Sequence, residues 1–388
     1  MPPAPPAAID PTSGRPAADP LLALADRCVQ CGLCLPHCPT YRLDRTETEG
    51  PRGRIALARA LADGSLDAAP AADAHLDHCL GCRRCEAVCP AGVSYGELLV
   101  ETRRRQRERR GAGLRQRAVE WLVGRPALLD RLLGAYRALY PLLPKPLPRP
   151  PRKPRIRVRG ISLSTPGAKA VALFTGCVAR RYDAPVHAAL ATLCGAAGFE
   201  ATVPDGQACC GALHAHAGNT SATDALAQRN RAAFAPGITV LGSASGCHEQ
   251  LADALDGHAP VRDAISFLLQ HADALRFRPA SQRVALHLPC TQRADVRSDK
   301  ALRALLARIP GLDLVELPDT GCCGAAGTHM LDFPERARAL RQPLLDALAG
   351  SGATVLLSAN IGCRLHLMMG ERTIPVRHPL EFLAEHLA

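Results

Sequence analysis

Aromatic residues are scarce in this chain, at 3% of 388 residues. Its cores must therefore rest mainly on Leu, Val and Ala. Nucleic-acid bases stack on aromatic side chains, and almost none accompany the two arginine-rich runs, Arg103–Arg110 and Arg149–Arg159. We therefore expect no nucleic-acid partner. The net charge of +11 leaves two interpretations of these runs open, a solvated surface or contact with anionic lipid.

Long apolar runs are also missing. No uncharged apolar run reaches the roughly 18–20 residues that a membrane-spanning helix needs, and charged residues interrupt the most apolar helical stretch, Trp121 to Leu143. The N-terminus lacks the charged-then-apolar pattern of an export signal, and its Pro/Ala-rich start is typical of disorder. We therefore expect a cytoplasmic protein, at most peripherally attached to the cytoplasmic face of the inner membrane.

Cysteine, in contrast, is abundant, with 17 residues. Disulfides persist mainly in exported proteins, so metal or cluster ligation is the favoured use of these thiols. Composition divides the chain into a disordered tail (1–20), a domain with eight cysteines (21–110), a helical and Pro/Arg-rich linker (111–165), and two repeats (166–275 and 276–388) that share the other nine.

The motif C-x2-C-x2-C-x3-C-P occurs twice in the first half, with identical internal spacing. In bacterial two-cluster ferredoxins, the first three cysteines of such a motif hold one [4Fe-4S] cluster and the fourth reaches the other. The alternative is zinc, which also binds CxxC pairs but rarely uses this three-step loop. The expected ligand sets are Cys28, Cys31, Cys34 and Cys89 for cluster 1, and Cys79, Cys82, Cys85 and Cys38 for cluster 2.

The segment between the two motifs, RGRIALARALADG, has a helical pattern. The domain over 21–110 should therefore be mainly helical. Arg52, Arg54, Arg83 and Arg84 lie near the cysteines in the sequence. Positive charge close to an anionic cluster would raise its reduction potential; the ordinary alternative is that these arginines face solvent.

The second half repeats itself after about 113 residues. VALFTGC, ending at Cys177, matches VALHLPC, ending at Cys290. Short apolar strands alternate with helical segments in both copies, which predicts parallel βαβ units. Each cysteine stretch directly follows a predicted strand, so the stretches should converge at the carboxyl edge of a sheet. The predicted strands are 170–176, 199–204 and 238–244, then 283–289, 312–318 and 353–360, with helices over 184–195 and 219–234 in the first copy.

Each copy carries a Cys-Cys-Gly triplet with one cysteine before it and one after it. Adjacent cysteines fit one relaxed tetrahedral zinc poorly but can reach two irons of a distorted cluster. Gly211 and Gly324 should allow positive φ or a close approach at the turn. A further iron–sulfur cluster, zinc, or merely small buried residues remain open, with Cys194 outside the pattern as a structural thiol. The candidate ligands are Cys177, Cys209, Cys210 and Cys247, then Cys290, Cys322, Cys323 and Cys363.

The order of these parts, with EGPRGRIALARAL, GCCGAAGTHML, SANIGCRLHL and VRHPLEFLAEHL, resembles the glycolate oxidase iron–sulfur subunits from about residue 21 onward. The resemblance implies FAD-containing partner subunits that oxidise glycolate to glyoxylate, and a quinone-type or other acceptor that this chain supplies with electrons. The chain has no GxGxxG after a strand, so it should not be active alone. One departure is that Cys247 and Cys363 lack the further CxxC cysteine of heterodisulfide reductase relatives, which puts a five-cysteine cluster in doubt; His366 is a weak substitute.

We therefore predict an α+β multidomain protein, with a mainly helical two-cluster ferredoxin domain followed by two α/β Cys-Cys-Gly domains with parallel strands. Its expected role is electron transfer within a glycolate dehydrogenase. Alternatives are a subunit of a D-lactate or other 2-hydroxy-acid dehydrogenase, a heterodisulfide or quinone reductase-like catalytic subunit, and a zinc-bearing scaffold.

Overall fold

The computed structural model describes residues 19–142, 147–154, 169–371 and 373–388. Most of the predicted tail, and Arg155–Arg159 of the second basic run, lie outside these residues. Asp19 and Pro20, assigned to the tail from the sequence, instead open the first helix: the Asp19 side chain accepts a hydrogen bond from the Leu21 backbone N–H at 2.9 Å. This is the usual N-cap arrangement, which satisfies a free amide of the first helical turn.

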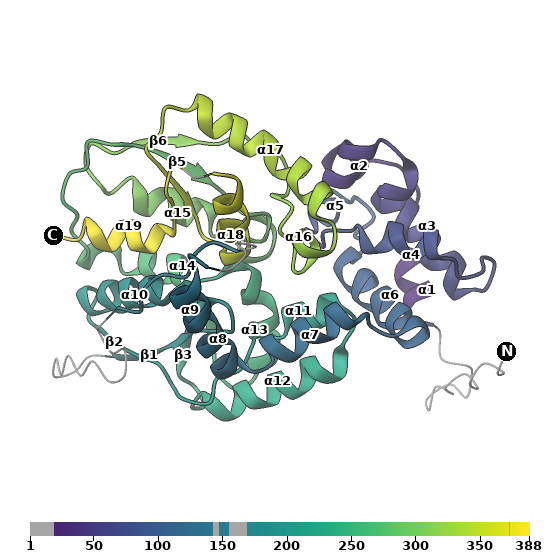
Figure 1. The fold of residues 1–388 in the computed structure, drawn as a ribbon, viewed down its shortest axis with the longest axis horizontal. Helices are drawn as coiled ribbons and strands as arrows, with labels where there is room; N and C mark the ends of the chain where they lie inside the picture. Colours follow the sequence, from purple (N-terminus) through teal and green to yellow (C-terminus); the bar gives the residue numbers. More distant parts are fainter. Residues whose placement is uncertain (1–18, 143–146, 155–168, 372) are drawn as a thin grey trace.

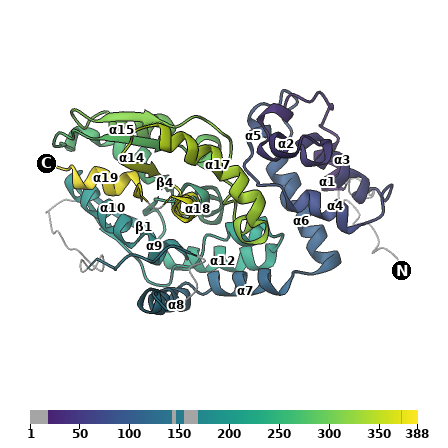
Figure 2. The same ribbon diagram turned by 45° about the horizontal axis from the view of Figure 1, so that its top comes forward.

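The N-terminal domain is helical, as predicted, and lies to one side of the two sheets (Figures 1 and 2). Proline at the first helical turn starts four of its helices, since the missing N–H costs nothing there. Its helices are α1 (Pro20–Ala25), α2 (Pro39–Asp44), α3 (Pro51–Ala62), α4 (Pro70–Asp77), α5 (Arg84–Ala87) and α6 (Tyr95–Arg110).

The apolar helical stretch after this domain forms two helices, α7 (Leu114–Val123) and α8 (Pro126–Leu139). The break falls at Gly124 and Arg125, because Pro126 opens a new helix and disfavours helical backbone before it. The buried sides of α7 and α8 pack against Tyr182 and Leu365, one from each repeat. Within the described residues, no helix is long and apolar enough to cross a membrane.

Each repeat forms a four-stranded parallel sheet, with strand orders β2-β1-β3-β4 and β6-β5-β7-β8. The six predicted strands are confirmed, and the sequence missed one edge strand of each sheet, β4 and β8. The strands are β1 (Lys169–Phe174), β2 (Phe199–Thr202), β3 (Thr239–Gly242), β4 (Val261–Asp263), β5 (Arg283–His287), β6 (Asp313–Glu316), β7 (Val355–Ser358) and β8 (Val376–Arg377).

Helices surround both sheets (Figure 1). The two helices predicted in the first copy are α10 and α12. The first repeat contains α9 (Ala179–Tyr182), α10 (Ala184–Ala196), α11 (Ala212–His216), α12 (Thr220–Ala233), α13 (His248–Leu255) and α14 (Ala264–Gln270). The second contains α15 (Asp299–Leu306), α16 (His329–Asp332), α17 (Pro334–Gly350), α18 (Ile361–Gly370) and α19 (Pro379–Glu385).

The two repeats share one apolar core. Alternate residues of a strand point to opposite faces of its sheet, and Val171 of β1 and Val284 of β5 both enter the shared core. Their neighbours, Ala172 and Ala285, face separate cores on the other side of each sheet. The last helix, α19, packs on α10 of the first repeat. The repeats are therefore fused and hold their cysteine edges in a fixed relation.

Candidate metal centres

The first ferredoxin-type site is a small pocket in the N-terminal domain. Four thiols predicted to act together line it with Cys85, namely Cys28, Cys31, Cys34 and Cys89. Arg52 borders the loop, donating to the Gln30 carbonyl at 3.0 Å and pairing with Glu47 at 2.5 Å. Gly32 has φ +81° there, and a Cβ on it would lie 2.8 Å from the Arg52 guanidinium. The positive φ favours glycine at this position of the cysteine loop.

The second site adjoins the first. Cys85 lines both pockets, so the two sites are direct neighbours. The thiols of the second pocket are Cys38, Cys79, Cys82 and Cys85. The chain thus brings Cys38 to the second motif and Cys89 to the first, which is the crossed arrangement that two-cluster ferredoxins use.

The chemistry of these thiols fits a cationic iron–sulfur core. Burial, followed by the charges of neighbouring cysteines, raises the pKa of Cys82 and of Cys85 well above that of an ordinary thiol. Several thiolates cannot remain crowded in a buried pocket without compensating positive charge. All the cysteines of the described residues are free of disulfides, so the thiols remain available as ligands.

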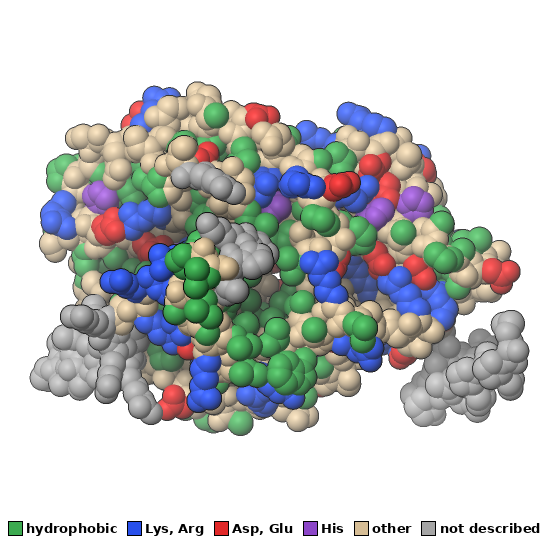
Figure 3. All heavy atoms as spheres, in the orientation of Figure 1, with side chains coloured by type: hydrophobic (Ala, Val, Ile, Leu, Met, Phe, Trp, Pro, Cys, Tyr) green, Lys and Arg blue, Asp and Glu red, His purple; other side chains and the backbone are tan. Residues whose placement is uncertain are grey.

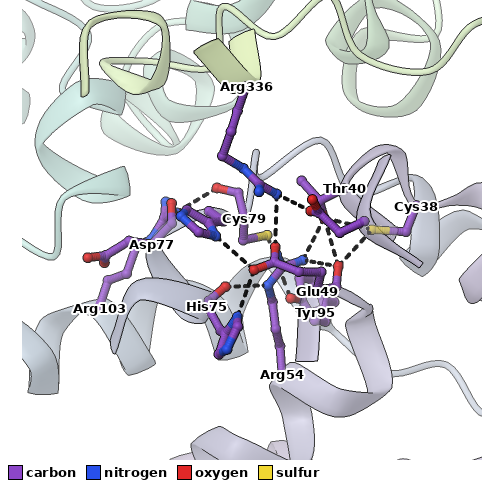
Figure 4. A network of polar contacts seen from close by, with 12 residues as sticks. Cys38, Thr40, Glu49, Arg54, His75, Asp77, Cys79, Tyr95, Arg103 and Arg336 are labelled. Carbon is purple, nitrogen blue, oxygen red and sulfur yellow. Dashed lines mark hydrogen bonds and ion pairs between the residues drawn. The ribbon is translucent and has the colours of Figure 1, made fainter. Parts of the chain in front are cut away.

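A buried arginine lies behind the second site (Figure 4). Arg54 is 1% exposed and donates to the Thr40 hydroxyl at 2.9 Å and to Glu49 Oε2 at 2.6 Å. The Thr40 hydroxyl lies 3.2 Å from Cys38 Sγ. The Thr40 hydroxyl thus links the positively charged Arg54 to Cys38, a cysteine of the pocket. Of the four arginines that the sequence places near the cysteines, this one is fully buried.

Glu49 is the counterion of Arg54 and the centre of a larger network (Figure 4). Burial opposes its ionisation, but hydrogen bonds with His78 and His75 at 2.7 Å each, and the charge of Arg54, lower its pKa to about 2. Glu49 and the two histidines have the composition of a metal site. However, Arg54 and Arg336 both form ion pairs with the Glu49 carboxylate. Since a cation would meet two guanidinium groups there, we interpret the group as a structural ion-pair network.

Two more groups that the sequence did not reveal contact Cys79. The Tyr95 hydroxyl lies 3.6 Å from its Sγ, and Arg103 donates to its carbonyl at 2.7 Å. Tyr95 begins α6, and its side chain is 3% exposed. The start of α6 thereby covers the second pocket.

The Cys-Cys-Gly cysteines of the first repeat gather beyond the carboxyl ends of β1 and β3. The Cys177 and Cys209 sulfurs are 3.5 Å apart, and Cys210 is hydrogen-bonded to Cys247. The hydrogen bond between Cys177 and Cys209, together with burial, raises the pKa of Cys177 well above the usual thiol value. Gly211 follows with φ +97°, as the sequence predicted for the turn.

The second repeat reproduces these pairings. Cys323 and Cys363 lie 3.0 Å apart, and a hydrogen bond with Cys322, followed by burial, raises the pKa of Cys290 well above the usual value. Gly324 has φ +86°. The thiols in each repeat are therefore close enough to share a bound metal group.

Two residues near these sites have ordinary structural roles. Cys194 is fully buried in the shared core, where burial raises its thiol pKa to about 12. His366 is 2% exposed, and its Nε2 lies 3.1 Å from the Ala337 carbonyl. Its ring is thus held by the backbone, as expected for a buried structural histidine.

The ferredoxin-type domain contacts the cysteine site of the second repeat directly. Leu80, Cys322 and Leu340 form a small apolar cluster against which Cys82 and Cys290 pack. The apolar clusters around the first repeat's cysteines come from that repeat, from α7 and α8 and from Leu365, and within the described residues they include no residue of the ferredoxin-type domain. The two repeats are therefore unequal neighbours of the second ferredoxin pocket.

Ion pairs of two arginines fix this arrangement. Arg84 pairs with Asp319 of the second repeat at 2.9 Å. Arg83 pairs with Glu249 of the first repeat and lies 3.7 Å from Asp295 of the second. These arginines therefore join the loop of the second cysteine motif to both repeats.

These features define an iron–sulfur protein with a two-cluster ferredoxin-type domain and two fused cysteine-rich domains. Residues 24–93 match the family model for a 4Fe-4S dicluster domain, and residues 171–252 and 284–368 match that for a cysteine-rich domain.

The chain is 31% identical over 401 residues to the glycolate oxidase iron–sulfur subunit of Escherichia coli, covering 93% of each protein. It is 32% identical over 394 residues to a probable glycolate oxidase iron–sulfur subunit of Bacillus subtilis, covering 88% of each. It is also 24% identical over 385 residues to one subunit of the dihydromethanophenazine:CoB–CoM heterodisulfide reductase of Methanosarcina acetivorans, covering 90% of each. The chain belongs to the family of glycolate oxidase iron–sulfur subunits, which confirms the predicted family and fold class.

Proposed function

We propose that this chain carries electrons inside a glycolate-oxidising complex. FAD-containing partner subunits would oxidise glycolate to glyoxylate, and this chain would pass the electrons towards a quinone-type acceptor. The observation that carries the proposal is the pair of adjoining thiol pockets that share Cys85. When bound, iron–sulfur clusters supply one-electron chemistry. A flavin that has taken up two electrons from its substrate can therefore pass them on to such clusters one at a time.

The proposed cluster ligands are taken from the cysteines that line the two pockets. Each pocket then holds one [4Fe-4S] cluster through three cysteines of one motif and the fourth cysteine of the other. The sets are Cys28, Cys31, Cys34 and Cys89, and Cys79, Cys82, Cys85 and Cys38.

The exposure of the two pockets gives the proposal a direction. Cys31 is exposed, and Val29 and Leu33 beside it are 67% and 56% exposed. The second pocket is instead covered by Tyr95 and by the second repeat. Because these two exposed apolar side chains line the same pocket, they support a docking surface there. We assign the first pocket to the flavoprotein side and the second pocket to the acceptor side.

Variants of this docking surface test the assignment. Val29→Asp and Leu33→Asp should slow reduction of the chain by its flavoprotein partner, while cluster absorbance stays unchanged. Leu66, 40% exposed elsewhere in the domain, supplies the matched control, Leu66→Asp. Unchanged reduction of the Val29 and Leu33 variants would place the electron entry elsewhere.

A second candidate function places chemistry in the repeats. The close thiol pairs Cys177–Cys209 and Cys323–Cys363 favour it, as does the similarity to a protein named as part of a heterodisulfide reductase. Metal analysis separates the candidates, because two [4Fe-4S] clusters account for about eight irons per chain. A markedly higher iron content would place further clusters in the repeats, and stoichiometric zinc would favour a scaffold.

The proposed complex works in the cytoplasm, with the chain attached peripherally at most to the membrane. D-Lactate or another 2-hydroxy acid is the alternative substrate, because substrate selection belongs to the flavin subunits. Comparing glycolate with D-lactate as the reductant of the whole complex decides between them.

A further inference from the structure

The arginine-rich helix α6 is largely neutralised within the fold. From the sequence, its run was a candidate for contact with anionic lipid. Five of its arginines instead pair with carboxylates at 2.5–2.8 Å. These pairs are Arg104–Glu101, Arg105–Asp19, Arg107–Glu120, Arg109–Asp73 and Arg110–Asp77.

The two helices that follow have the opposite character. Their outer sides expose large apolar residues two helical turns apart, an arrangement that places both on one face of a helix. In α7 these are Leu114 and Trp121, 79% and 50% exposed; in α8 they are Leu132 and Leu139, 47% and 49% exposed. Figure 3 shows hydrophobic side chains gathered over these helices with basic ones beside them.

The exposed charges on this face are all positive. Arg115, Arg117, Arg125 and Arg131 are exposed and form no ion pair with a carboxylate in the part of the chain that is described. Arg125 instead lies 4.4 Å from the centre of the Trp121 ring. Between residues 111 and 142 the acidic side chains are Glu120, which is buried against Arg107, and Asp130, which pairs with Arg181.

We propose that the outer face of α7 and α8, made of Leu114, Trp121, Leu132, Leu139 and the four arginines, binds the surface of an anionic lipid bilayer. Leucine and tryptophan side chains would enter the boundary between headgroups and acyl chains, and the unpaired guanidinium groups would lie against the lipid phosphates. Tryptophan prefers this boundary because its ring is apolar with one polar edge. This combination of apolar and purely cationic groups distinguishes the face from α6.

The surface leads towards the second ferredoxin pocket. A cavity of about 430 Å³ is lined by Cys79 and Arg103 on one side and by Arg115 and Gln116 of α7 on the other. Seating α7 on a bilayer would place this cavity near the lipid. The docking inference itself does not depend on the proposed acceptor, because it rests on the exposed side chains alone.

Vesicle co-sedimentation of the cluster-containing full chain tests the proposal. The probes are vesicles of phosphatidylcholine mixed with phosphatidylglycerol, and vesicles of phosphatidylcholine alone. We expect binding to the mixed vesicles that weakens with salt. Changing Arg115, Arg117, Arg125 and Arg131 together to Gln should lower partitioning by roughly 600-fold, since each surface cation contributes about fivefold.

Two further variants keep the test specific. Leu132→Ser with Leu139→Ser should weaken binding to mixed vesicles without altering cluster absorbance, which reports an intact fold. The matched control changes four exposed arginines elsewhere to Gln and should bind as the wild type does; these are Arg42, Arg262, Arg276 and Arg297. The proposal would be overturned if the wild-type chain did not bind mixed vesicles. It would also be overturned if the variant of the α7 and α8 arginines bound them as well as the wild type does. The same holds if these variants lose only the flavoprotein partner, because the face would then be a protein interface.

Discussion

From the sequence alone, Arg54 could have been an ordinary solvent-facing arginine, but in the fold it is fully buried. It is 1% exposed and reaches Glu49, Thr40 and the carbonyl of His75, so its charge is fully engaged. Two positions earlier on the same helix, Arg52 pairs with Glu47 at the surface, where the side chains are 32% and 47% exposed. The same chemical pair therefore occurs in two dielectric environments.

Removing each arginine should give very different results. Arg54→Gln removes the fully buried guanidinium partner of Glu49, and breaking a buried pair costs about 3–5 kcal/mol. Arg52→Gln breaks an exposed pair worth about 0–1 kcal/mol. The temperature at which cluster absorbance is lost compares them. Equal losses would show that the Arg54 network does not stabilise the domain.

Cys209 and Cys194 offer a second contrast between similar residues. Both thiols are fully buried in the first repeat, but Cys209 lies 3.5 Å from Cys177, whereas Cys194 packs in the shared apolar core. Cys209→Ala should lower the metal content of the purified chain, and Cys194→Ala should leave it unchanged. Metal analysis of both variants checks this, and identical metal content would remove the support for a ligand role in the repeat.

At the scale of elements, the turn after each cysteine pair depends on glycine. Gly211 and Gly324 both have positive φ, but their surroundings differ. A Cβ on Gly324 would lie 2.7 Å from the Ala337 carbonyl oxygen, a backbone atom, whereas one on Gly211 would meet the Thr223 methyl at 3.2 Å. The second repeat therefore leaves less room.

Alanine at each position should expose this difference. A left-handed backbone costs an L-residue about 1–2 kcal/mol at either site. Gly324→Ala adds a backbone clash of the kind that costs about 1–3 kcal/mol. Thermal unfolding should therefore show the larger loss for Gly324→Ala, with metal lost mainly from the second repeat. A larger loss for Gly211→Ala would contradict the described turn.

The sequence predicted the elements whose signals are local. Apolar runs identified six of the eight strands, but the edge strands β4 and β8 were missed because Val261–Asp263 and Val376–Arg377 have no apolar run. The doubled cysteine motifs indicated which thiols meet. Thr40, Glu49 and Tyr95 could not be found in this way, since their contacts depend on how distant helices pack. The ion pairs of Arg107 and Arg109 with Glu120 and Asp73 are long-range for the same reason.

At the scale of the whole molecule, buried histidines in both repeats make stability depend on pH. Burial lowers the pKa of His187 in α10 and of His287 in β5 from 6.5 to about 4. The unfolded chain then binds more protons between these values, so stability must fall as the pH drops from 6.5 towards 4. Glu49, with its pKa lowered from 4.5 to about 2, adds a loss only below about pH 4.5.

Hydrogen–deuterium exchange, corrected for the intrinsic effect of pH, measures this directly. Amide protection in α10 and β5 should decline between pH 6.5 and 4. His187→Leu should flatten the profile of α10 more than that of β5. Protection that is constant across this range would contradict the burial of these histidines as uncharged groups.

The arrangement of sites connects the whole molecule to its proposed role. The exposed first pocket adjoins the covered second pocket, and Cys82 of the second pocket packs beside the cysteines of the second repeat. In the proposed complex, the flavin subunits carry out the two-electron oxidation of the hydroxy acid.

Anaerobic reduction of the clusters by glycolate tests this central claim most directly. The purified chain is mixed with glycolate, with and without the flavin subunits of its complex, and the visible absorbance of the clusters is followed. We predict bleaching only when the flavin subunits and glycolate are both present. Bleaching by glycolate with the chain alone, or none with the complete complex, would contradict the account.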